Sequence, residues 1–196
     1  MYPTSINDRY LDDVVEILRD GGLIIYPTDT FYAVGCNALN NAAVERVCRL
    51  KGIDPKRQNL SIVCADISQA SEYARIDNTA YSVIHRNLPG PFTFLLPAST
   101  RLPKIFKGRK IVGVRVPDNA IARAIADRLG APLLSTSVEK IDGETVTDPF
   151  HIGSHYEGQV DVMIDGGEGG DRGSAIVDLT DSHSPEILRD GPLPLA

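Results

Sequence analysis

Apolar and polar residues repeat along this chain with two different periods, which predict helices and strands in turn. Helical spacing runs through residues 11–18, 42–50, 67–74, 79–88 and 121–129. Short apolar runs typical of strands fall at 23–27, 60–64, 92–96, 111–116, 133–135, 160–164, 175–179 and 186–188. We therefore predict an α/β fold (α+β in some schemes) in a single domain over residues 1–196, with a mixed sheet and flanking helices.

The ends of these elements are marked by cap and turn residues. The expected N-caps are Asp8, either Asn40 or Asn41, and Asp118. Gly130 stands where the helix over 121–129 should end. A Pro-Gly-Pro sequence at 89–91 breaks the chain before the strand at 92–96. The polar stretch 139–147 is predicted to be a mobile loop.

Candidate chemistry begins where the first predicted strand ends. Residues 26–36 read YPTDTFYAVGC, so Thr28, Asp29 and Thr30 gather two hydroxyls and a carboxylate directly after an apolar run. Pro27 cannot donate a ladder hydrogen bond and favours an extended or turning path. Sites are often built at such strand ends. A polar turn stabilised by its own side chains explains the same residues equally well.

Composition describes an ordinary globular protein, with 42% hydrophobic and 23% charged residues. No apolar run is long enough to span a membrane, and residues 1–5 lack the basic and apolar regions of a secretion signal. Cys36, Cys48 and Cys64 form no Cys-x-x-Cys pair, so buried, reduced thiols are expected. These features favour a cytoplasmic protein without membrane attachment.

The net charge of −6 argues against a protein that coats nucleic acid, but basic residues are concentrated locally. The smaller basic cluster consists of Lys51, Lys56 and Arg57. The main basic stretch contains no Asp or Glu and comprises Arg101, Lys104, Lys107, Arg109, Lys110 and Arg115. The two stretches could bind an anionic ligand, or they could be solvated loops.

Two further motifs carry little chemistry by themselves. The glycine-dense run 165–174 joins two predicted strands and matches no nucleotide-binding fingerprint, so it is either a ligand-approaching loop or a plain connection. His151 and His155 share a helical spacing, but no further ligands accompany them. No metal site is therefore predicted, and no catalytic residue is assigned.

Hydroxyls and one arginine sit on or beside predicted buried strands. Ser135, Thr136 and Ser137 follow an apolar pair and could bond phosphate or carboxylate oxygens, or could cap the next turn. Arg115 is flanked by two valines in the strand at 111–116. Because an unpaired buried charge is costly, Arg115 should meet either a bound carboxylate or a protein Asp or Glu.

Taken together, short motifs along nearly the whole chain resemble the YrdC/YciO family, which includes the threonylcarbamoyl-AMP synthases of tRNA modification. In chain order the matching pieces are Gly21-Gly22, Tyr26-Pro27-Thr28-Asp29-Thr30-x-Tyr32, Lys51-Gly52, Pro89-Gly90-Pro91-x-Thr93, Gly113-x-Arg115-x-Pro117, Ser135-Thr136-Ser137, Asp165-Gly166-Gly167, Ser174 and Leu188-Arg189-x-Gly191. Each is weak alone, and their common order carries the resemblance.

The resemblance implies a twisted mixed sheet around a large, positively lined concave cleft. It also implies a synthase reaction in which L-threonine, bicarbonate and ATP, with Mg²⁺, give threonylcarbamoyl-adenylate and pyrophosphate. The residues that would surround threonine are Thr28, Arg115, Ser135 and Ser174. Those that would face the nucleotide and its phosphates are Lys51, Ser137 and Arg189, with Lys56 or Arg57 supplying further charge.

The chain departs from the synthase pattern at four positions, and these departures resemble the YciO branch. Ile53 stands where the synthases carry arginine, and Glu139 where they carry asparagine. Cys64 replaces a histidine and Ala175 a threonine. An anion at position 139 near a triphosphate would cost several kcal/mol, roughly 4 for two charges ~4 Å apart at an effective dielectric of about 20.

Three functions are consistent with this pattern. The first is a weak threonylcarbamoyl-AMP synthase that serves tRNA modification. The second is a module of the YciO type that binds double-stranded RNA or tRNA with little or no catalysis, because RNA duplexes are recognised mostly by shape and backbone. The third is a related acyl-adenylate or carbamate enzyme with another small substrate.

Overall fold

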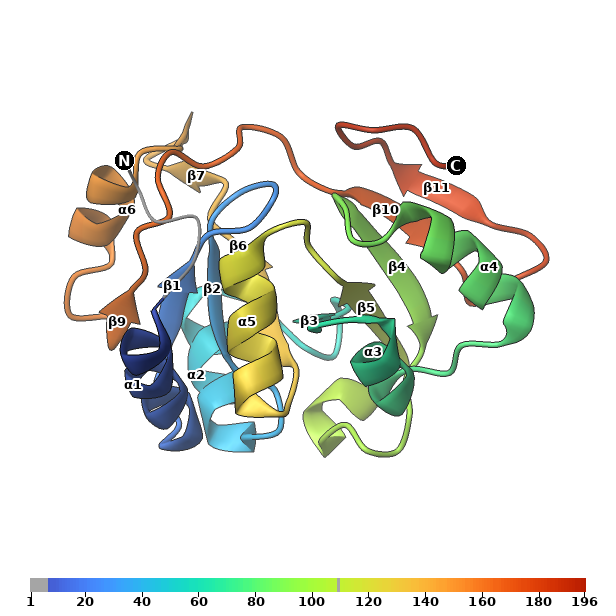
Figure 1. Ribbon diagram of the computed structural model, residues 1–196, viewed down its shortest axis with the longest axis horizontal. Coiled ribbons are helices and arrows are strands. Elements are labelled where there is room, and N and C mark those ends of the chain that lie inside the picture. Colours follow the sequence, from blue (N-terminus) through green and yellow to red (C-terminus); the bar gives the residue numbers. More distant parts are fainter. Residues whose placement is uncertain (1–6, 109) are drawn as a thin grey trace.

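The computed structural model describes residues 7–108 and 110–196 (Figure 1). Its helices are α1 (Asp8–Arg19), α2 (Asn41–Leu50), α3 (Ile67–Tyr73), α4 (Asn78–Asn87), a 3₁₀ helix η1 (Lys104–Gly108), α5 (Ala120–Leu129) and α6 (Pro149–His155). Its strands are β1 (Ile24–Tyr26), β2 (Ala33–Asn37), β3 (Ser61–Val63), β4 (Phe92–Pro97), β5 (Ile111–Arg115), β6 (Leu133–Ser137), β7 (Lys140–Ile141), β8 (Glu144–Thr145), β9 (Val162–Met163), β10 (Ala175–Asp178) and β11 (Glu186–Arg189).

One mixed sheet runs through the described chain in the order β11-β10-β4-β5-β3-β6-β2-β1-β9. The pairs β1–β9, β3–β5 and β4–β10 are parallel, and the remaining pairs in this sheet are antiparallel. The α/β class and the mixed sheet predicted from the sequence are confirmed. Strand β2 was missed, because its small residues Ala33 and Gly35 do not form an apolar run.

Helices cover both faces of the β1–β6 part of the sheet. Leu133 and Val63 belong to a core cluster with α1 and α5, whereas their neighbours Leu134 and Ile62 belong to a second cluster with α2. Successive strand residues point to opposite faces, so the two clusters lie on opposite sides of the sheet. This double covering explains why β1 is buried at every position.

The cap predictions needed small corrections. Asn7 rather than Asp8 caps α1, and Asn119 rather than Asp118 caps α5. In both cases a neighbouring Asn has the better geometry, because its side-chain oxygen accepts the hydrogen bond from the third amide along. Asn40 caps α2. Gly130 ends α5 in the left-handed conformation, as predicted.

The predicted loop at 139–147 and the basic stretch both hold regular structure. The polar stretch 139–147 is not an irregular loop but contains the β7–β8 hairpin, with Asp142 and Gly143 at positive φ between the strands. The basic stretch beyond 101 contains η1. Arg109 of this stretch and the N-terminal residues 1–5 lie outside the described residues.

Other predictions concern burial and the membrane. Cys36, Cys48 and Cys64 are free and buried, as expected. Burial raises the pKa of Cys36 to about 12. Within the described residues, no helix has the length and apolar character needed to cross a membrane.

Strand β5 carries the centre of the candidate site, with β3 on one side and β4 on the other. Gly113 lies opposite Ser61 in β3. A Cβ at Gly113 would meet the Ser61 Oγ at 2.4 Å and the Thr93 Cγ2 at 3.0 Å. The absence of a side chain here therefore lets the Ser61 and Thr93 side chains approach β5 closely, two residues before Arg115 ends the strand.

Close backbone packing around β2 gives a testable prediction. A Cβ at Gly35 would lie 2.7 Å from the Leu134 carbonyl oxygen and 2.8 Å from the Tyr26 ring. Since neither group can move freely, Gly35→Ala should lower the free energy of unfolding by about 1–3 kcal/mol in urea titrations.

The matched control is Gly153→Ala in α6, where the new Cβ would approach only the Met163 sulfur, at 3.2 Å. A helix gains up to about 1 kcal/mol from this exchange. Equal effects of the two substitutions would contradict the packing described for β2.

Candidate functional site

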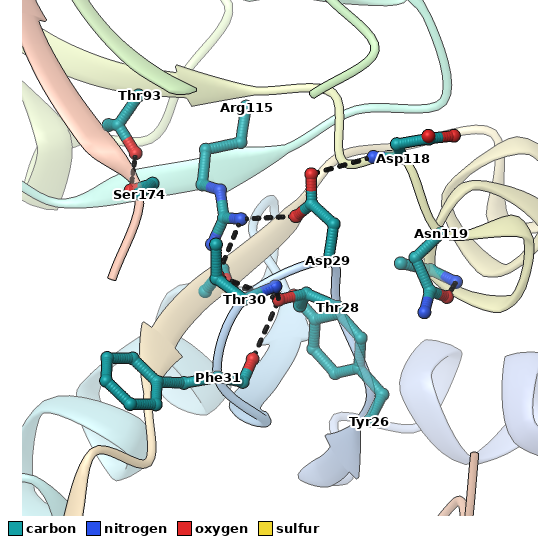
Figure 2. A network of polar contacts seen from close by, with 12 residues as sticks. Tyr26, Thr28, Asp29, Thr30, Phe31, Thr93, Arg115, Asp118, Asn119 and Ser174 are labelled. Atoms are coloured by element: carbon teal, nitrogen blue, oxygen red, sulfur yellow. Dashed lines mark hydrogen bonds and ion pairs between the residues drawn. The ribbon is translucent and has the colours of Figure 1, made fainter. Parts of the chain in front are cut away.

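Arg115 is a buried charge at the carboxyl end of β5, and its side chain is 8% exposed. Its Nη2 donates hydrogen bonds to Asp29 Oδ1 at 2.8 Å and to the Thr30 hydroxyl at 3.0 Å (Figure 2). Burial lowers the pKa of Arg115, and the Asp29 carboxylate acts in the opposite direction. A protein carboxylate is thus a partner of Arg115, which is one of the two kinds of partner expected from the sequence.

Asp29 is fixed by a second contact on its other oxygen. Asp29 Oδ2 accepts a hydrogen bond from the backbone amide of Asp118 at 2.9 Å, just before α5 (Figure 2). The Asp29 side chain is 9% exposed. The carboxylate therefore joins the loop after β1 to the ends of β5 and α5.

The loop between β1 and β2 is held by its own hydroxyls. The Thr28 hydroxyl donates to the Phe31 carbonyl at 2.7 Å and accepts from the Thr30 amide at 3.1 Å (Figure 2). This is the self-bonded polar turn that the sequence allowed. Thr28 thereby orients the carbonyl and amide groups that place Thr30 beside Arg115.

The glycine-dense run 165–174 forms a wall against this loop. The Tyr32 hydroxyl donates to the Gly167 carbonyl at 2.6 Å and accepts from the Gly166 amide at 3.0 Å. The Gly170 amide donates to the Thr30 carbonyl at 2.8 Å. A Cβ at Gly170 would lie 2.7 Å from that oxygen, so a glycine is required for this approach.

Paired hydroxyls lie on both sides of β5, one pair at β4 and β10 and the other at β1 and β6. Ser174, just before β10, lies with its hydroxyl 2.8 Å from that of Thr93 in β4 (Figure 2). Ser135 in β6 accepts a hydrogen bond from the Tyr26 hydroxyl at 2.8 Å. Burial raises the pKa of Tyr26, so this phenol stays protonated and remains a donor.

Arg115 and the hydroxyl-bearing residues Thr93, Ser135 and Ser174 line a cavity of about 160 Å³. An engineered cavity of about 150 Å³ holds one benzene molecule, so a cavity of this volume suits a ligand as small as an amino acid. Larger ligands occupy pockets of about 300–1,000 Å³. The lining residues are Thr30, Phe31, Val47, Ile53, Asn59, Leu60, Ser61, Thr93, Arg115, Leu134, Ser135, Thr136, Ser137, Gly173, Ser174, Ile176 and Arg189.

A second hollow of about 280 Å³ adjoins the first and shares Phe31, Gly173 and Arg189 with it. Arg189 Nε donates to the Ser174 carbonyl at 3.0 Å, and its Nη1 lies 4.0 Å from Glu139 Oε1. The Ser137 hydroxyl donates to the same Glu139 oxygen at 2.8 Å. Glu139 thus engages the Ser137 hydroxyl and faces the Arg189 guanidinium.

The structure brings together only part of the predicted site. Arg115, Ser135, Ser137, Ser174 and Arg189 line the cavity, and so does the departure Ile53. Their roles in binding stay predictions.

Four other predicted residues lie away from the cavity wall. The Thr28 hydroxyl is engaged within its loop. Lys51 Nζ donates to the Tyr156 hydroxyl at 3.1 Å. Lys56 and Arg57 are exposed in a turn, where Arg57 pairs with Asp54 at 3.5 Å. Contacts of these four with a ligand remain untested predictions.

Residues that the sequence interpretation did not assign also build the site. Asp29, Thr30, Thr93 and Tyr26 each contact one of the predicted residues. The signal for Asp29 was the requirement that a buried Arg115 have an acidic partner. The partners of the strand hydroxyls depend on register, which no local pattern reveals.

Fold and site together define an α/β protein with a small, polar cavity built around a buried arginine at a strand end. The chain belongs to the Sua5/YciO/YrdC family, whose model, described as telomere recombination, matches residues 16–191. The family predicted from the sequence motifs is therefore confirmed.

Among the relatives, the uncharacterized protein YciO of Escherichia coli strain K12 is 39% identical over 194 residues, covering 97% of this chain and 93% of YciO. Its crystal structure superposes with a TM-score of 0.87 over 95% of this chain and 91% of that one. The threonylcarbamoyl-AMP synthase of Halorhodospira halophila is 34% identical over 155 residues, covering 78% of this chain and 81% of the synthase.

A further solved structure is that of Pyrococcus abyssi Sua5 complexed with L-threonine. It is 32% identical, with a TM-score of 0.87 over 97% of this chain and 56% of that chain. Relatives of this chain thus include a named synthase and a structure that contains L-threonine.

The buried ion pair predicts a coupled effect on stability. Arg115→Met should lower the free energy of unfolding by about 3–5 kcal/mol, because it leaves the Asp29 carboxylate buried beside one amide only. The double variant Asp29→Asn/Arg115→Met should regain most of that loss, because no buried charge remains and the introduced carboxamide oxygen can still accept from the Asp118 amide. Urea unfolding of the unsubstituted protein, both single variants and the double variant measures the coupling; additive losses would contradict it.

Proposed function

We propose that this chain binds L-threonine in the Arg115 cavity and forms L-threonylcarbamoyladenylate from threonine, bicarbonate and ATP, with weak activity, for the N6-threonylcarbamoyladenosine modification of tRNA. The observation that carries the proposal is the buried Arg115, with hydroxyls of Thr30, Ser135 and Ser174 around a cavity of threonine size. The synthase relative and the Sua5 structure with L-threonine support it.

In this proposal the amine of threonine first adds to bicarbonate and gives a carbamate with loss of water. A carbamate oxygen then attacks the α-phosphorus of ATP, and pyrophosphate leaves with the electrons of the broken P–O bond. The protein has little covalent chemistry to perform, so its contribution is to position the reactants and stabilise charge. Arg115 would hold the threonine carboxylate with a guanidinium donor.

The nucleotide would extend from the small cavity, which Ser137 lines, into the adjoining hollow, where Arg172 and Arg189 offer donors. Glu139 opposes the triphosphate there and is the physical reason for weak activity. Among the described residues, no group of three or more acidic, Cys or His side chains could hold a metal ion. Mg²⁺ would therefore arrive with ATP, held by its phosphates, and neutralise part of their charge.

RNA binding is a second candidate, favoured by a separate basic hollow. Arg75, Lys110, Ser99 and Thr100 line a cavity of about 500 Å³ that shares no residue with the Arg115 cavity. Phosphate contacts from such cations lack sequence specificity and weaken steeply with salt. This candidate predicts RNA affinity in the absence of synthase activity.

The experiment that tests the proposal mixes the protein with ATP, Mg²⁺, L-threonine and bicarbonate, then measures pyrophosphate and detects the adenylate by mass. We expect slow turnover that requires threonine and is lost in Arg115→Ala. Arg189→Gln replaces a half-buried side chain of the same site and should also reduce turnover at least tenfold. Arg86→Ala replaces an exposed side chain on α4 and should leave turnover unchanged. No turnover, together with salt-sensitive RNA binding, would favour the second candidate.

Restoring the synthase residues should raise the activity. In Glu139→Asn the carboxylate that accepts from Ser137 and faces Arg189 becomes a neutral group, and Ile53→Arg adds a cation at the cavity wall. We expect the double variant to bind ATP more tightly and turn over at least tenfold faster. Unchanged activity with a correctly folded variant would show that these two positions do not cause the weakness.

A further inference from the structure

Both arginines of the Arg115 cavity already have a carboxylate close by. Arg115 is paired with Asp29 at 2.8 Å, and Arg189 lies 4.0 Å from Glu139. Among the residues that line the cavity, Arg115 and Arg189 are the charged ones. The cavity with its two acidic neighbours is therefore close to electrically neutral.

The two pairs differ in how much water screens them. Side chains of Arg115 and Asp29 are 8% and 9% exposed, whereas those of Arg189 and Glu139 are 45% and 47% exposed. Charge interactions are strong in a buried, low-dielectric setting and weak at an exposed one. The inner pair thus sets the charge that a ligand in the cavity experiences.

A neutral inner pair favours one class of ligand. A plain carboxylate would add a net negative charge next to Asp29, and a buried unbalanced charge is costly. A zwitterionic amino acid brings a carboxylate for the arginine and an ammonium group for its own balance, so the neutrality is kept. Without Asp29, the cavity would carry a net positive charge and attract simple anions.

We infer that Asp29 is a specificity-determining residue, which makes the Arg115 cavity select zwitterionic amino acids over carboxylates that lack an ammonium group. The inference rests on the proposed function, because it assumes that the cavity binds an amino acid. Asp29 acts through Arg115: it engages Nη2, while the Nε of Arg115 is buried and has no hydrogen-bond partner within the described structure.

Several contacts hold Asp29 in this position. One carboxylate oxygen is bound to Arg115 and the other to the Asp118 amide, and the loop is braced by Thr28 and by the glycine wall. Because Asp29 is fixed beside Arg115, we expect its carboxylate to stay in place when a ligand binds. It therefore repels a competing anion.

The test compares L-threonine with 3-hydroxybutanoate of matching stereochemistry, which lacks only the ammonium group. Isothermal titration calorimetry gives both dissociation constants. The unsubstituted protein should bind threonine at least tenfold more tightly. In Asp29→Asn this preference should fall at least tenfold, and 3-hydroxybutanoate should bind more tightly than it does to the unsubstituted protein. If Asp29 had a purely structural role, Asp29→Asn would weaken the binding of both ligands by the same factor.

The matched control is Asp118→Asn, whose side chain is exposed and whose backbone amide is retained. It should leave the preference unchanged. Equal affinities of the two ligands for the unsubstituted protein would overturn the inference and leave the proposed function standing. This comparison does not depend on whether any variant folds. Absence of binding by either ligand would overturn the proposed function and the inference with it.

Discussion

The buried ion pair between Arg115 and Asp29 is the interaction on which the site depends. It places a full positive charge at the end of a central strand, where an isolated guanidinium would be too costly to bury. Asp29 neutralises that charge and also accepts from the Asp118 amide, so the loop after β1 is joined at one carboxylate to residues 115–118, which are far from it in sequence. The hydroxyls around the cavity are arranged with respect to this fixed point.

Charges are balanced differently at the two ends of the site. At the inner end, the pairing leaves a small, rigid and nearly neutral hollow suited to an amino acid. At the outer end, Glu139 accepts from Ser137 and approaches Arg189. Away from the cavity wall, Tyr156 accepts from Lys51. The groups proposed to hold phosphates are thus engaged with other parts of the protein.

Much of the fold followed from the sequence, because long amphipathic helices and apolar strands carry strong local signals. Strand β2 was missed because Ala33 and Gly35 are small, and its place depends on tight contact with Leu134 and Tyr26. The hairpin at 140–145 was missed because its strands are two residues each and mostly polar. Such elements depend on register and packing rather than on local preference.

The site was predictable in its chemistry but not in its contacts. The need of Arg115 for an acidic partner could be stated from its apolar neighbours, yet Asp29 lies 86 positions earlier in the chain. That Lys51 faces the nucleotide stays a prediction, and its contact with Tyr156, a residue 105 positions away, was not expected from the sequence. Pairings over such distances arise from the topology of the sheet, which places β5 beside β3 and β4 and brings the β1–β2 loop over its end.

We propose above all that Arg115, held by Asp29, receives the carboxylate of a small amino acid. A crystal structure of the protein grown with L-threonine tests it most directly. We expect the threonine carboxylate within hydrogen-bond distance of the Arg115 guanidinium, with the Asp29 contact kept. Threonine bound elsewhere, or an Arg115 that leaves Asp29 to reach it, would show that this pair does not form the amino-acid site.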